Sequence, residues 1–167
     1  SDDLAAEAEQ LGLRIAEQLG VVGVLAVELF ETIDGTLLVN ELAMRPHNSG
    51  HWTMNGSVTS QFEQHIRAVL DYPLGDTRPL APVTVMANVL GAAQPPAMAM
   101  DERLHHLFGR IPDAHVHLYG KDERPGRKIG HVNVLGDEPE SVRERAERAA
   151  HWLSHAVWTD GWESHRE

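Results

Sequence analysis

The sequence contains no cysteine, and this absence excludes several kinds of chemistry. Without cysteine there is no disulfide framework, no thiolate zinc site and no cysteine nucleophile. The redox compartment of the protein therefore cannot be read from its composition. The length of 167 residues falls in the range of about 100 to 200 residues that holds one ordinary domain or two small ones. On length alone, this favours a small protein over a large multidomain enzyme.

Basic residues are scarce, and long apolar runs are missing. The chain has 14 Lys+Arg against 25 Asp+Glu, a net charge of −11. Such a chain repels a phosphate backbone, so nucleic acid is a poor partner and any anion site must be a local exception. The longest apolar run, Val21 to Val27, is far shorter than the ~20 residues that cross a bilayer. Because the acidic N-terminus also lacks the basic start of a secretion signal, we expect no membrane span and a cytoplasmic location.

The first half of the chain predicts a helix, a β-hairpin and a second helix. The predicted elements are a helix over residues 4–19, strands over 21–31 and 36–42 joined by a turn at Asp34-Gly35, and a helix from Ser60 to Pro73. Helical spacing of apolar residues, a hairpin turn signal and a capping box support these assignments. The first helix begins with no strand before it, which is unusual for a self-contained nucleotide-binding domain.

The second half predicts a separate small module. Prolines and a glycine between Tyr72 and Pro82 indicate a linker, and we place a domain boundary near residue 80. Beyond it we expect strands over 83–90, 114–119 and 129–135 and helices over 98–108 and 139–154. The chain is thus expected to form two mixed α/β (α+β) domains, residues 1–80 and 81–158. A loosely held tail, residues 159–167, follows them.

The hairpin places two carboxylates opposite each other. With Asp34-Gly35 as a two-residue loop, the predicted cross-strand pairs are Ile33–Thr36, Phe30–Val39 and Glu28–Glu41. Like charges in such a pair destabilise the strands unless something neutralises them, and Mg²⁺ does so with one or two carboxylates plus substrate phosphates. Asn40 adds a neutral oxygen ligand if the strand is bulged, and otherwise faces the other way. Alternatively, both glutamates point to solvent, because hairpin registers slip easily.

A segment rich in hydrogen-bond donors follows the second strand. It reads Arg45-Pro46-His47-Asn48-Ser49-Gly50-His51-Trp52. The guanidinium of Arg45 suits phosphate or carboxylate, and His47, Asn48 and the Ser49 hydroxyl can orient a small oxyanion. A hydrolase triad is not supported, since Ser49 lacks a nucleophile-elbow setting. The structural alternative is a loop whose histidines cap nearby backbone groups.

A basic loop is the local exception in this acidic chain. Residues 121–128 carry four cations in eight positions. Because Pro125-Gly126 turns the chain, Lys121 and Arg127 can converge on one anion, and a phosphate monoester suits both. The alternative is a solvated loop whose own Asp and Glu neutralise it at little energetic gain.

These motifs resemble a known family. The residues that carry the resemblance are Val27-Glu28-Leu29-Phe30, Val39-Asn40-Glu41-Leu42-Ala43, the segment 45–52, Asn55-Gly56, Ser60-Gln61-Phe62-Glu63-Gln64-His65, His117-Leu118-Tyr119-Gly120-Lys121 and Arg124-Pro125-Gly126-Arg127-Lys128-Ile129-Gly130-His131. Over essentially the whole chain, the sequence resembles the bacterial carboxyaminoimidazole ribonucleotide synthases. These enzymes are the ATP-dependent subunit of phosphoribosylaminoimidazole carboxylase, in purine biosynthesis.

The resemblance implies an ATP-grasp fold, of which this chain matches only the later part. The family has an N-terminal α/β domain, a two-lobed ATP-binding domain and a small β-rich C-terminal domain. The chain resembles the C-terminal part of the ATP-grasp domain followed by the C-terminal domain. Because the lobe that covers the adenine has no counterpart here, we expect the isolated chain to lack turnover.

The resemblance also implies a reaction and a role for each candidate residue. The family joins bicarbonate to aminoimidazole ribonucleotide with cleavage of ATP, through carboxyphosphate. By resemblance, Glu28, Asn40 and Glu41 form the nucleotide site, with Glu28 and Glu41 binding Mg²⁺ or Mn²⁺; Arg45, His47 and Asn48 are catalytic and hold bicarbonate; Ser49, Lys121 and Arg127 bind substrate, the last two at its 5′-phosphate. The family usually forms homodimers.

Two other functions remain open from the sequence. One is another ATP-grasp ligase that forms an acyl phosphate, such as the formate-using purine transformylase or a biotin carboxylase. The other is a non-catalytic interaction module that keeps the fold.

Overall fold

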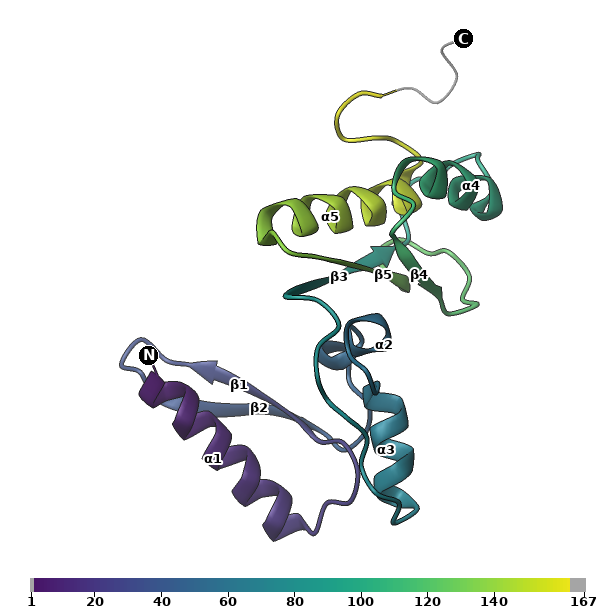
Figure 1. The fold of residues 1–167 in the computed structure, drawn as a ribbon. Coiled ribbons are helices and arrows are strands. Elements are labelled where there is room, and N and C mark those ends of the chain that lie inside the picture. Colours follow the sequence, from purple (N-terminus) through teal and green to yellow (C-terminus); the bar gives the residue numbers. More distant parts are fainter. Residues whose placement is uncertain (1, 163–167) are drawn as a thin grey trace. The chain divides into compact units, whose positions relative to one another are not determined.

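The computed structural model describes residues 2–162 of the chain (Figure 1). The chain divides into two compact units, residues 1–78 and 79–167, and this division lies close to the boundary predicted near residue 80. Within the part that is described, no helix is long and apolar enough to cross a membrane.

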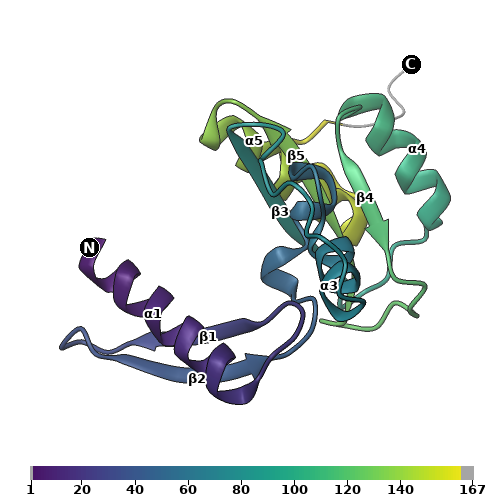
Figure 2. The same ribbon diagram turned by 60° about the horizontal axis from the view of Figure 1, so that its bottom comes forward.

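The first unit begins with a long helix that lies along a two-stranded sheet. Helix α1 (Asp2–Leu19) is followed by the antiparallel strands β1 (Ala26–Glu31) and β2 (Leu37–Ala43), and Figure 2 shows the three elements side by side. Small and apolar residues of α1, including Ala8, Leu13 and Ala16, line a hollow with Leu25 and Val27. The predicted helix and hairpin are confirmed, although α1 has no buried residue.

The hairpin register differs from the prediction near the turn and agrees with it at the glutamates. Phe30 pairs with Leu38 instead of Val39, and Thr32 instead of Ile33 pairs across the turn, where its N–H donates to the carbonyl of Thr36 at 3.0 Å. The loop therefore holds three residues and ends with Gly35 at φ 82°, a known hairpin geometry. A bulge at Asn40 adds one residue to β2 and restores the predicted pairing of Glu28 with Glu41.

The first strand starts later than predicted. Residues 21–25 form a connection rather than a strand, because Gly23 adopts φ 111° and the N–H of Val24 donates to Nδ1 of His65 at 3.1 Å. A Cβ at Gly23 would overlap the His65 ring. The apolar run predicted a strand here, and the prediction was wrong because the local pattern does not contain this contact with a distant histidine.

The rest of the first unit contains three short helical elements. They are the 3₁₀ helix η1 (Asn48–Gly50), α2 (Thr53–Gly56) and α3 (Gln61–Val69). The predicted capping box is confirmed, since Ser60 Oγ accepts from the N–H of Glu63 at 3.3 Å. No helix was expected at either of the two shorter elements: η1 lies within the segment 45–52, and α2 follows it directly.

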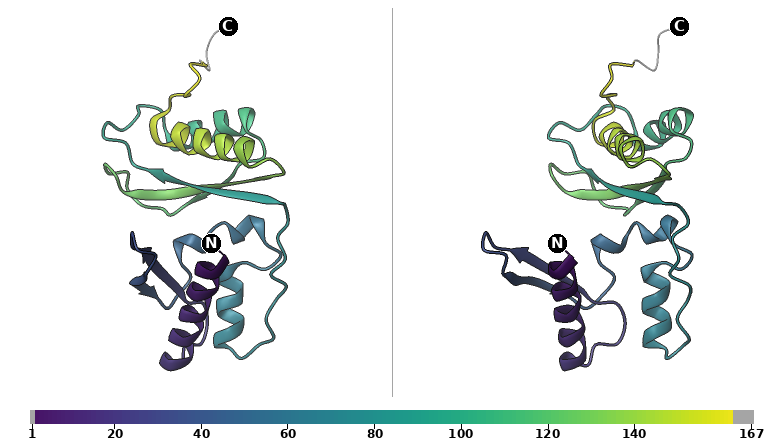
Figure 3. Two further views of the ribbon diagram at one scale, coloured as in Figure 1. Left: turned by 90° about the vertical axis from the view of Figure 1, so that its left-hand side faces the viewer. Right: turned by 60° about the vertical axis from the view of Figure 1, so that its left-hand side comes forward.

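The second unit is a three-stranded antiparallel sheet with two helices on one face (Figure 3). Its elements are β3 (Val83–Leu90), α4 (Met100–Arg110), β4 (His115–Leu118), β5 (Lys128–Gly136) and α5 (Pro139–His155), all at or near their predicted positions. The strand order is β3-β5-β4. Alternate residues of β5 and the apolar face of α5 meet in the core, where Val132, Val134, Val142, Ala146 and Leu153 are fully buried.

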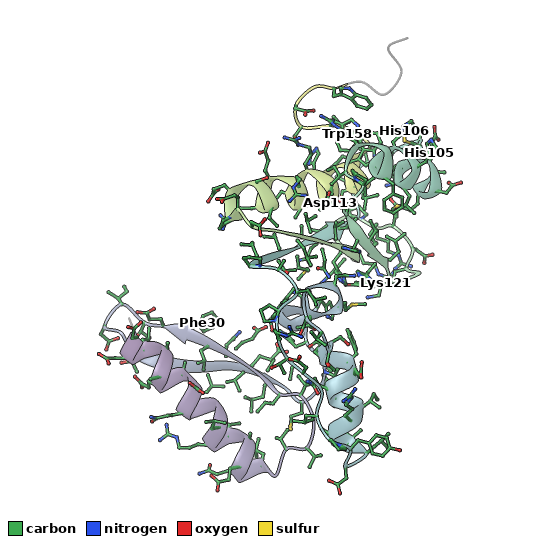
Figure 4. All side chains as sticks on the ribbon, in the orientation of Figure 1. Phe30, His105, His106, Asp113, Lys121 and Trp158 are labelled. Atoms are coloured by element: carbon green, nitrogen blue, oxygen red, sulfur yellow. The ribbon has the colours of Figure 1, made fainter. Side chains whose placement is uncertain are left out.

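The chain after α5 folds back onto this unit. Trp158, labelled in Figure 4, is 3% exposed and stacks on Trp152 with ring centroids 4.3 Å apart. The guanidinium of Arg110, the last residue of α4, lies over the Trp158 ring at 4.3 Å from its centroid. Trp162 contacts Trp158, and Asp160 pairs with Arg110. The predicted loose tail thus begins with residues that make side-chain contacts, and residues 163–167 lie outside the described part.

Candidate functional site

The hairpin brings two carboxylates and an amide to one face. Glu28 and Glu41 are direct cross-strand partners, so their side chains lie on the same side of the sheet. The bulge turns Asn40 to that side as well, and its Nδ2 donates to Glu28 Oε2 at 3.2 Å. The bulged alternative of the sequence analysis is therefore the one that the structure adopts, and Asn40 joins the glutamates.

His47 lies against the other oxygen of the same carboxylate. Its Nε2 is 3.1 Å from Glu28 Oε1, and its Nδ1 accepts from the N–H of Ser49 at 3.3 Å. The Ser49 hydroxyl lies 2.9 Å from the same Nδ1. Since Nδ1 is an acceptor in this network, the hydrogen is on Nε2 and is donated to Glu28. The alternative prediction, that the histidines of this loop cap nearby backbone groups, is also confirmed for His47, because its side chain caps η1. The same side chain orients the Glu28 carboxylate.

The remaining loop residues differ in their surroundings. Arg45 is exposed, and its Nη1 donates to the carbonyl of Pro46 at 3.1 Å. Asn48 is the first residue of η1, directly after His47. Arg45, His47 and Asn48 thus leave β2 in one short segment, and the guanidinium remains accessible to an anion.

The donors at the hairpin fit a hard divalent cation. Two carboxylates and an amide oxygen are the oxygen donors that Mg²⁺ takes, and Mg²⁺ completes its shell with water and substrate phosphates. Within residues 2–162 no group of three or more His, Cys, Asp or Glu side chains could hold a metal by itself.

The second unit contains a separate cationic group around Tyr119. The ammonium groups of Lys121 and Lys128 lie 5.3 and 5.7 Å from the centre of the Tyr119 ring, and Figure 4 shows Lys121 at the loop after β4. Burial, and secondarily the charge of Lys121, lowers the pKa of Lys128, and burial raises the pKa of Tyr119. The Tyr119 hydroxyl is 2.6 Å from Nδ1 of the buried His131.

Lys128 is the residue that sequence reasoning missed in this group. Lys121 was expected to act with Arg127, and in the structure Lys121 and Lys128 both lie near the Tyr119 ring. The available signal was the pairing of the two predicted strands, because Leu118 pairs with Gly130 and the N–H of Tyr119 donates to the carbonyl of Ile129, the residue after Lys128, at 2.9 Å.

The backbone of the basic loop is fixed from two sides. Gly91 donates to the carbonyl of Arg127 and accepts from the N–H of Gly126, each at 2.9 Å. A Cβ at Gly91 would overlap the Arg124 carbonyl, so this approach requires glycine. Glu123 is held by the buried Arg103 through bonds of 2.6 and 3.3 Å. Of the acidic residues within the loop, Asp122 pairs with Arg124 and Glu123 pairs outside it.

The two candidate groups therefore belong to different units. The carboxylate group and the segment 45–49 lie in the first unit, and Lys121, Arg127 and Lys128 lie in the second.

Comparison with known proteins identifies the class of each unit. Residues 1–62 match the family model of the ATP-grasp domain. Residues 84–145 match the model of the phosphoribosylaminoimidazole carboxylase C-terminal domain. The chain thus joins part of an ATP-grasp domain to this C-terminal domain, and the fold class expected from the sequence is confirmed.

Individual relatives define the family. The chain is 74% identical to N5-carboxyaminoimidazole ribonucleotide synthase of Mycobacterium tuberculosis (strain ATCC 25618 / H37Rv) over 99% of its own length and 38% of that protein. It is 55% identical to the synthase of Corynebacterium ammoniagenes over 95% of its own length and 39% of the relative. The chain belongs to the N5-carboxyaminoimidazole ribonucleotide synthase family and spans about two fifths of these relatives.

Solved structures of the family share the fold. The phosphoribosylaminoimidazole carboxylase ATPase subunit from Aquifex aeolicus superposes with a TM-score of 0.73 at 42% identity, covering 88% of this chain and 43% of that one. The synthase from Aspergillus clavatus, solved with ADP and 5-aminoimidazole ribonucleotide, superposes with a TM-score of 0.62 at 32% identity, covering 78% and 35%.

Proposed function

We propose that the polypeptide containing this chain catalyses the ATP-dependent carboxylation of 5-aminoimidazole ribonucleotide by bicarbonate, giving N5-carboxyaminoimidazole ribonucleotide. The observation that carries the proposal is the facing pair of Glu28 and Glu41, with Asn40 and His47 both directed at Glu28. This arrangement lies in sequence that matches an ATP-grasp domain. The matching C-terminal domain favours this reaction over other ATP-grasp ligases.

In this proposal the hairpin residues hold the nucleotide phosphates through a divalent cation. Glu28 and Glu41 supply carboxylate oxygens and Asn40 an amide oxygen, which suit Mg²⁺ or Mn²⁺. When bound, the cation neutralises charge on the phosphates as one phosphoryl group is transferred. His47 and Asn40 keep Glu28 oriented by donating to its two oxygens.

The segment after β2 orients the small anion. Arg45, His47 and Asn48 hold bicarbonate so that its oxygen attacks the γ-phosphate of ATP, giving ADP and carboxyphosphate. The amine of the ribonucleotide then takes the carboxyl group and phosphate leaves. Ser49 is the substrate-binding hydroxyl of the segment, and its hydroxyl lies 2.9 Å from His47 Nδ1.

The basic loop binds the other substrate. Lys121 and Arg127 bind the 5′-phosphate of the ribonucleotide, and Lys128 adds a third cation close to Lys121. A phosphate monoester suits this mixture of an Arg fork and Lys point charges. We further expect a homodimer in the cytoplasm.

The proposal is tested in the longest natural polypeptide that contains this chain. ADP release is coupled to a spectrophotometric signal, with ATP, ribonucleotide and either bicarbonate or formate. We expect release with bicarbonate and none above background with formate. Release with formate alone would assign the protein to the acyl-phosphate ligases. Binding of nucleotide and ribonucleotide without turnover under any of these conditions would favour a non-catalytic module.

Substitutions then test the two groups separately. Glu41→Gln is expected to lower bicarbonate-dependent ADP release by about 10²-fold, whereas Glu31→Gln, on the exposed end of β1, leaves it unchanged. Lys121→Ala is expected to raise the KM for the ribonucleotide roughly tenfold or more, with Arg143→Ala on α5 as the control. Equal effects in the matched variants would remove these residues from the site. The isolated 167-residue chain is expected to show no turnover in the same assay.

A further inference from the structure

Gln61 is a buried polar residue that contacts the candidate site only through its loop. It is the first residue of α3 and is 7% exposed. Its Oε1 accepts from the N–H of His47 at 2.9 Å, and its Nε2 donates to the carbonyl of His47 at 2.8 Å. Both backbone groups of His47 are therefore held by one side-chain amide.

The same amide also fixes the end of the loop. Nε2 of Gln61 lies 2.8 Å from Nδ1 of His51, and the His51 ring stacks on Phe62 with centroids 5.6 Å apart. The Gln61 side chain passes so close to Gly50 that a Cβ there would overlap its Oε1. Gln61 thus sits within the turn from His47 to His51 and determines its shape.

What Gln61 holds is the residue that orients Glu28. With its backbone fixed, His47 directs Nε2 to Glu28 Oε1 at 3.1 Å and Nδ1 to the N–H of Ser49 at 3.3 Å. A continuous set of hydrogen bonds therefore runs from α3 through His47 to the hairpin carboxylate. A small rotation of the 47–51 turn would break the His47–Glu28 contact, because a hydrogen bond weakens steeply with distance and angle.

A second glutamine on the same helix makes the same kind of contact elsewhere. Gln64 Oε1 accepts from the N–H of Gly75 at 2.9 Å, and its Nε2 donates to the carbonyl of Gly75 at 2.8 Å. Gly75 belongs to the segment after α3 and has no role in the candidate site. Gln64 is thus a control for the structural cost of losing a bidentate glutamine.

We propose that Gln61 is a positioning residue for the reaction, which fixes His47 so that His47 holds Glu28 in its working orientation. This inference rests on the proposed function, because it assigns Gln61 a part in that reaction. Gln61 itself touches no reacting group.

The test compares Gln61→Met with Gln64→Met in the longest natural polypeptide that contains this chain. Methionine keeps the length and volume of glutamine without its hydrogen bonds. We expect Gln61→Met to lower kcat for bicarbonate-dependent ADP release by about 10- to 100-fold, as for small misplacements of reacting groups, with the KM for the ribonucleotide unchanged. Gln64→Met is expected to lower the Tm by about as much as Gln61→Met does, because each variant loses the hydrogen bonds of one glutamine, and to leave kcat within about twofold of the unmodified protein. Equal losses of kcat in both variants would overturn the proposal.

A double-mutant cycle with His47→Ala separates positioning from general structural support. If Gln61 acts through His47, Gln61→Met has no further effect on kcat once His47 is alanine. Full additivity of the two losses would instead mean that Gln61 acts independently of His47, and would overturn the proposal.

Gln61→Glu, which keeps the acceptor for the His47 N–H and loses both Nε2 bonds, is expected to retain more activity than Gln61→Met. If Gln61→Met does not fold, the kcat of Gln61→Glu is compared with that of Gln64→Met instead. Failure of both to fold, with Gln64→Met folded, would make Gln61 purely structural.

A spectroscopic readout distinguishes failure of this inference from failure of the proposed function. With ¹⁵N-labelled histidine at constant pH, the His47 ring signals, assigned by their loss in His47→Ala, report which nitrogen carries hydrogen. We expect a single tautomer with hydrogen on Nε2 in the unmodified protein and in Gln64→Met, and averaged signals in Gln61→Met. If the unmodified protein shows no bicarbonate-dependent ADP release, the proposed function fails. Unaltered His47 signals in Gln61→Met overturn the positioning of His47 by Gln61, whatever the activity.

Discussion

The two units differ in how much apolar side chain they bury. In the second unit, α4 and α5 cover one sheet face and enclose a core that includes Leu107, Val132 and Trp152. In the first unit, Ala43 is the one apolar side chain that is buried among the described residues, and Phe30 remains 60% exposed. Apolar sequence alone therefore does not show which strand is buried, since β1 contains Ala26, Val27, Leu29 and Phe30 and none of them is fully buried.

The two units are therefore stabilised by different kinds of interaction. Burial of apolar area stabilises the second unit directly. The first unit depends on specific polar contacts, such as the glutamine bonds to His47 and Gly75 and the histidine bond to Val24. Each such bond contributes only about 0.5 to 1.5 kcal/mol net. The candidate carboxylate site lies in the unit with the smaller core.

The largest expected effect is in separate expression of the two units. We expect residues 79–167 to unfold in one cooperative urea transition, because they contain a closed core. Residues 1–78 are expected to show no such transition. Circular dichroism and amide proton dispersion in NMR spectra measure both. A cooperative transition of residues 1–78 with a similar urea midpoint would show that the first unit is as stable as the second and would contradict this expectation.

Single leucine substitutions test the difference in apolar burial between the two units within the whole chain. Leu107 is 0% exposed and Leu13 is 64% exposed. Leu107→Ala is expected to lower the unfolding free energy of the second unit by about 2 to 5 kcal/mol, through lost burial and a residual cavity. Leu13→Ala is expected to change the stability by less than about 0.5 kcal/mol. Urea denaturation followed by tryptophan fluorescence tests both, and similar losses in the two variants would contradict the contrast.

The smallest effect concerns the polar attachment after α5. The hydrogen bond from Arg110 lowers the pKa of Asp160 below that of an ordinary aspartate. A carboxyl whose folded pKa is lowered stabilises the fold above its unfolded pKa of about 4, and this contribution is lost as the pH falls through the folded value. Asp160→Asn should therefore lower the Tm slightly near neutral pH, and the difference from the unmodified protein should shrink below about pH 4. A difference that grows in acid would contradict this assignment; Glu9→Gln on α1 is the control.

The sequence predicted the elements well because their signals are local. Apolar patterning, turn residues and the proline that begins α5 placed all five elements of the second unit at or near their observed bounds. The same local signals predicted the pairing of Glu28 with Glu41. That pairing was right although its derivation was not, because the extra residue in the turn and the bulge at Asn40 compensate for each other.

The residues that sequence analysis missed act through contacts between distant segments. Gln61 was interpreted only as part of a capping box, while its amide reaches His47 fourteen residues away. Lys128 joins Lys121 because β4 and β5 pair. His65 shortens the first strand by binding Val24 across 41 residues. Such contacts depend on the tertiary fold, which local pattern does not contain.

The bulge at Asn40 means that β2 could be one residue shorter without separating the two glutamates. Glu28 pairs with Glu41 beyond the bulge, whereas the pairs nearer the turn are shifted by one. If Asn40 were deleted, the register set by the turn would by itself bring the same two glutamates together. The carboxylate pair would survive and only the amide would be lost. In an alignment, a one-residue gap between the two glutamates would therefore mark the presence or absence of this amide, with both carboxylates still opposite each other.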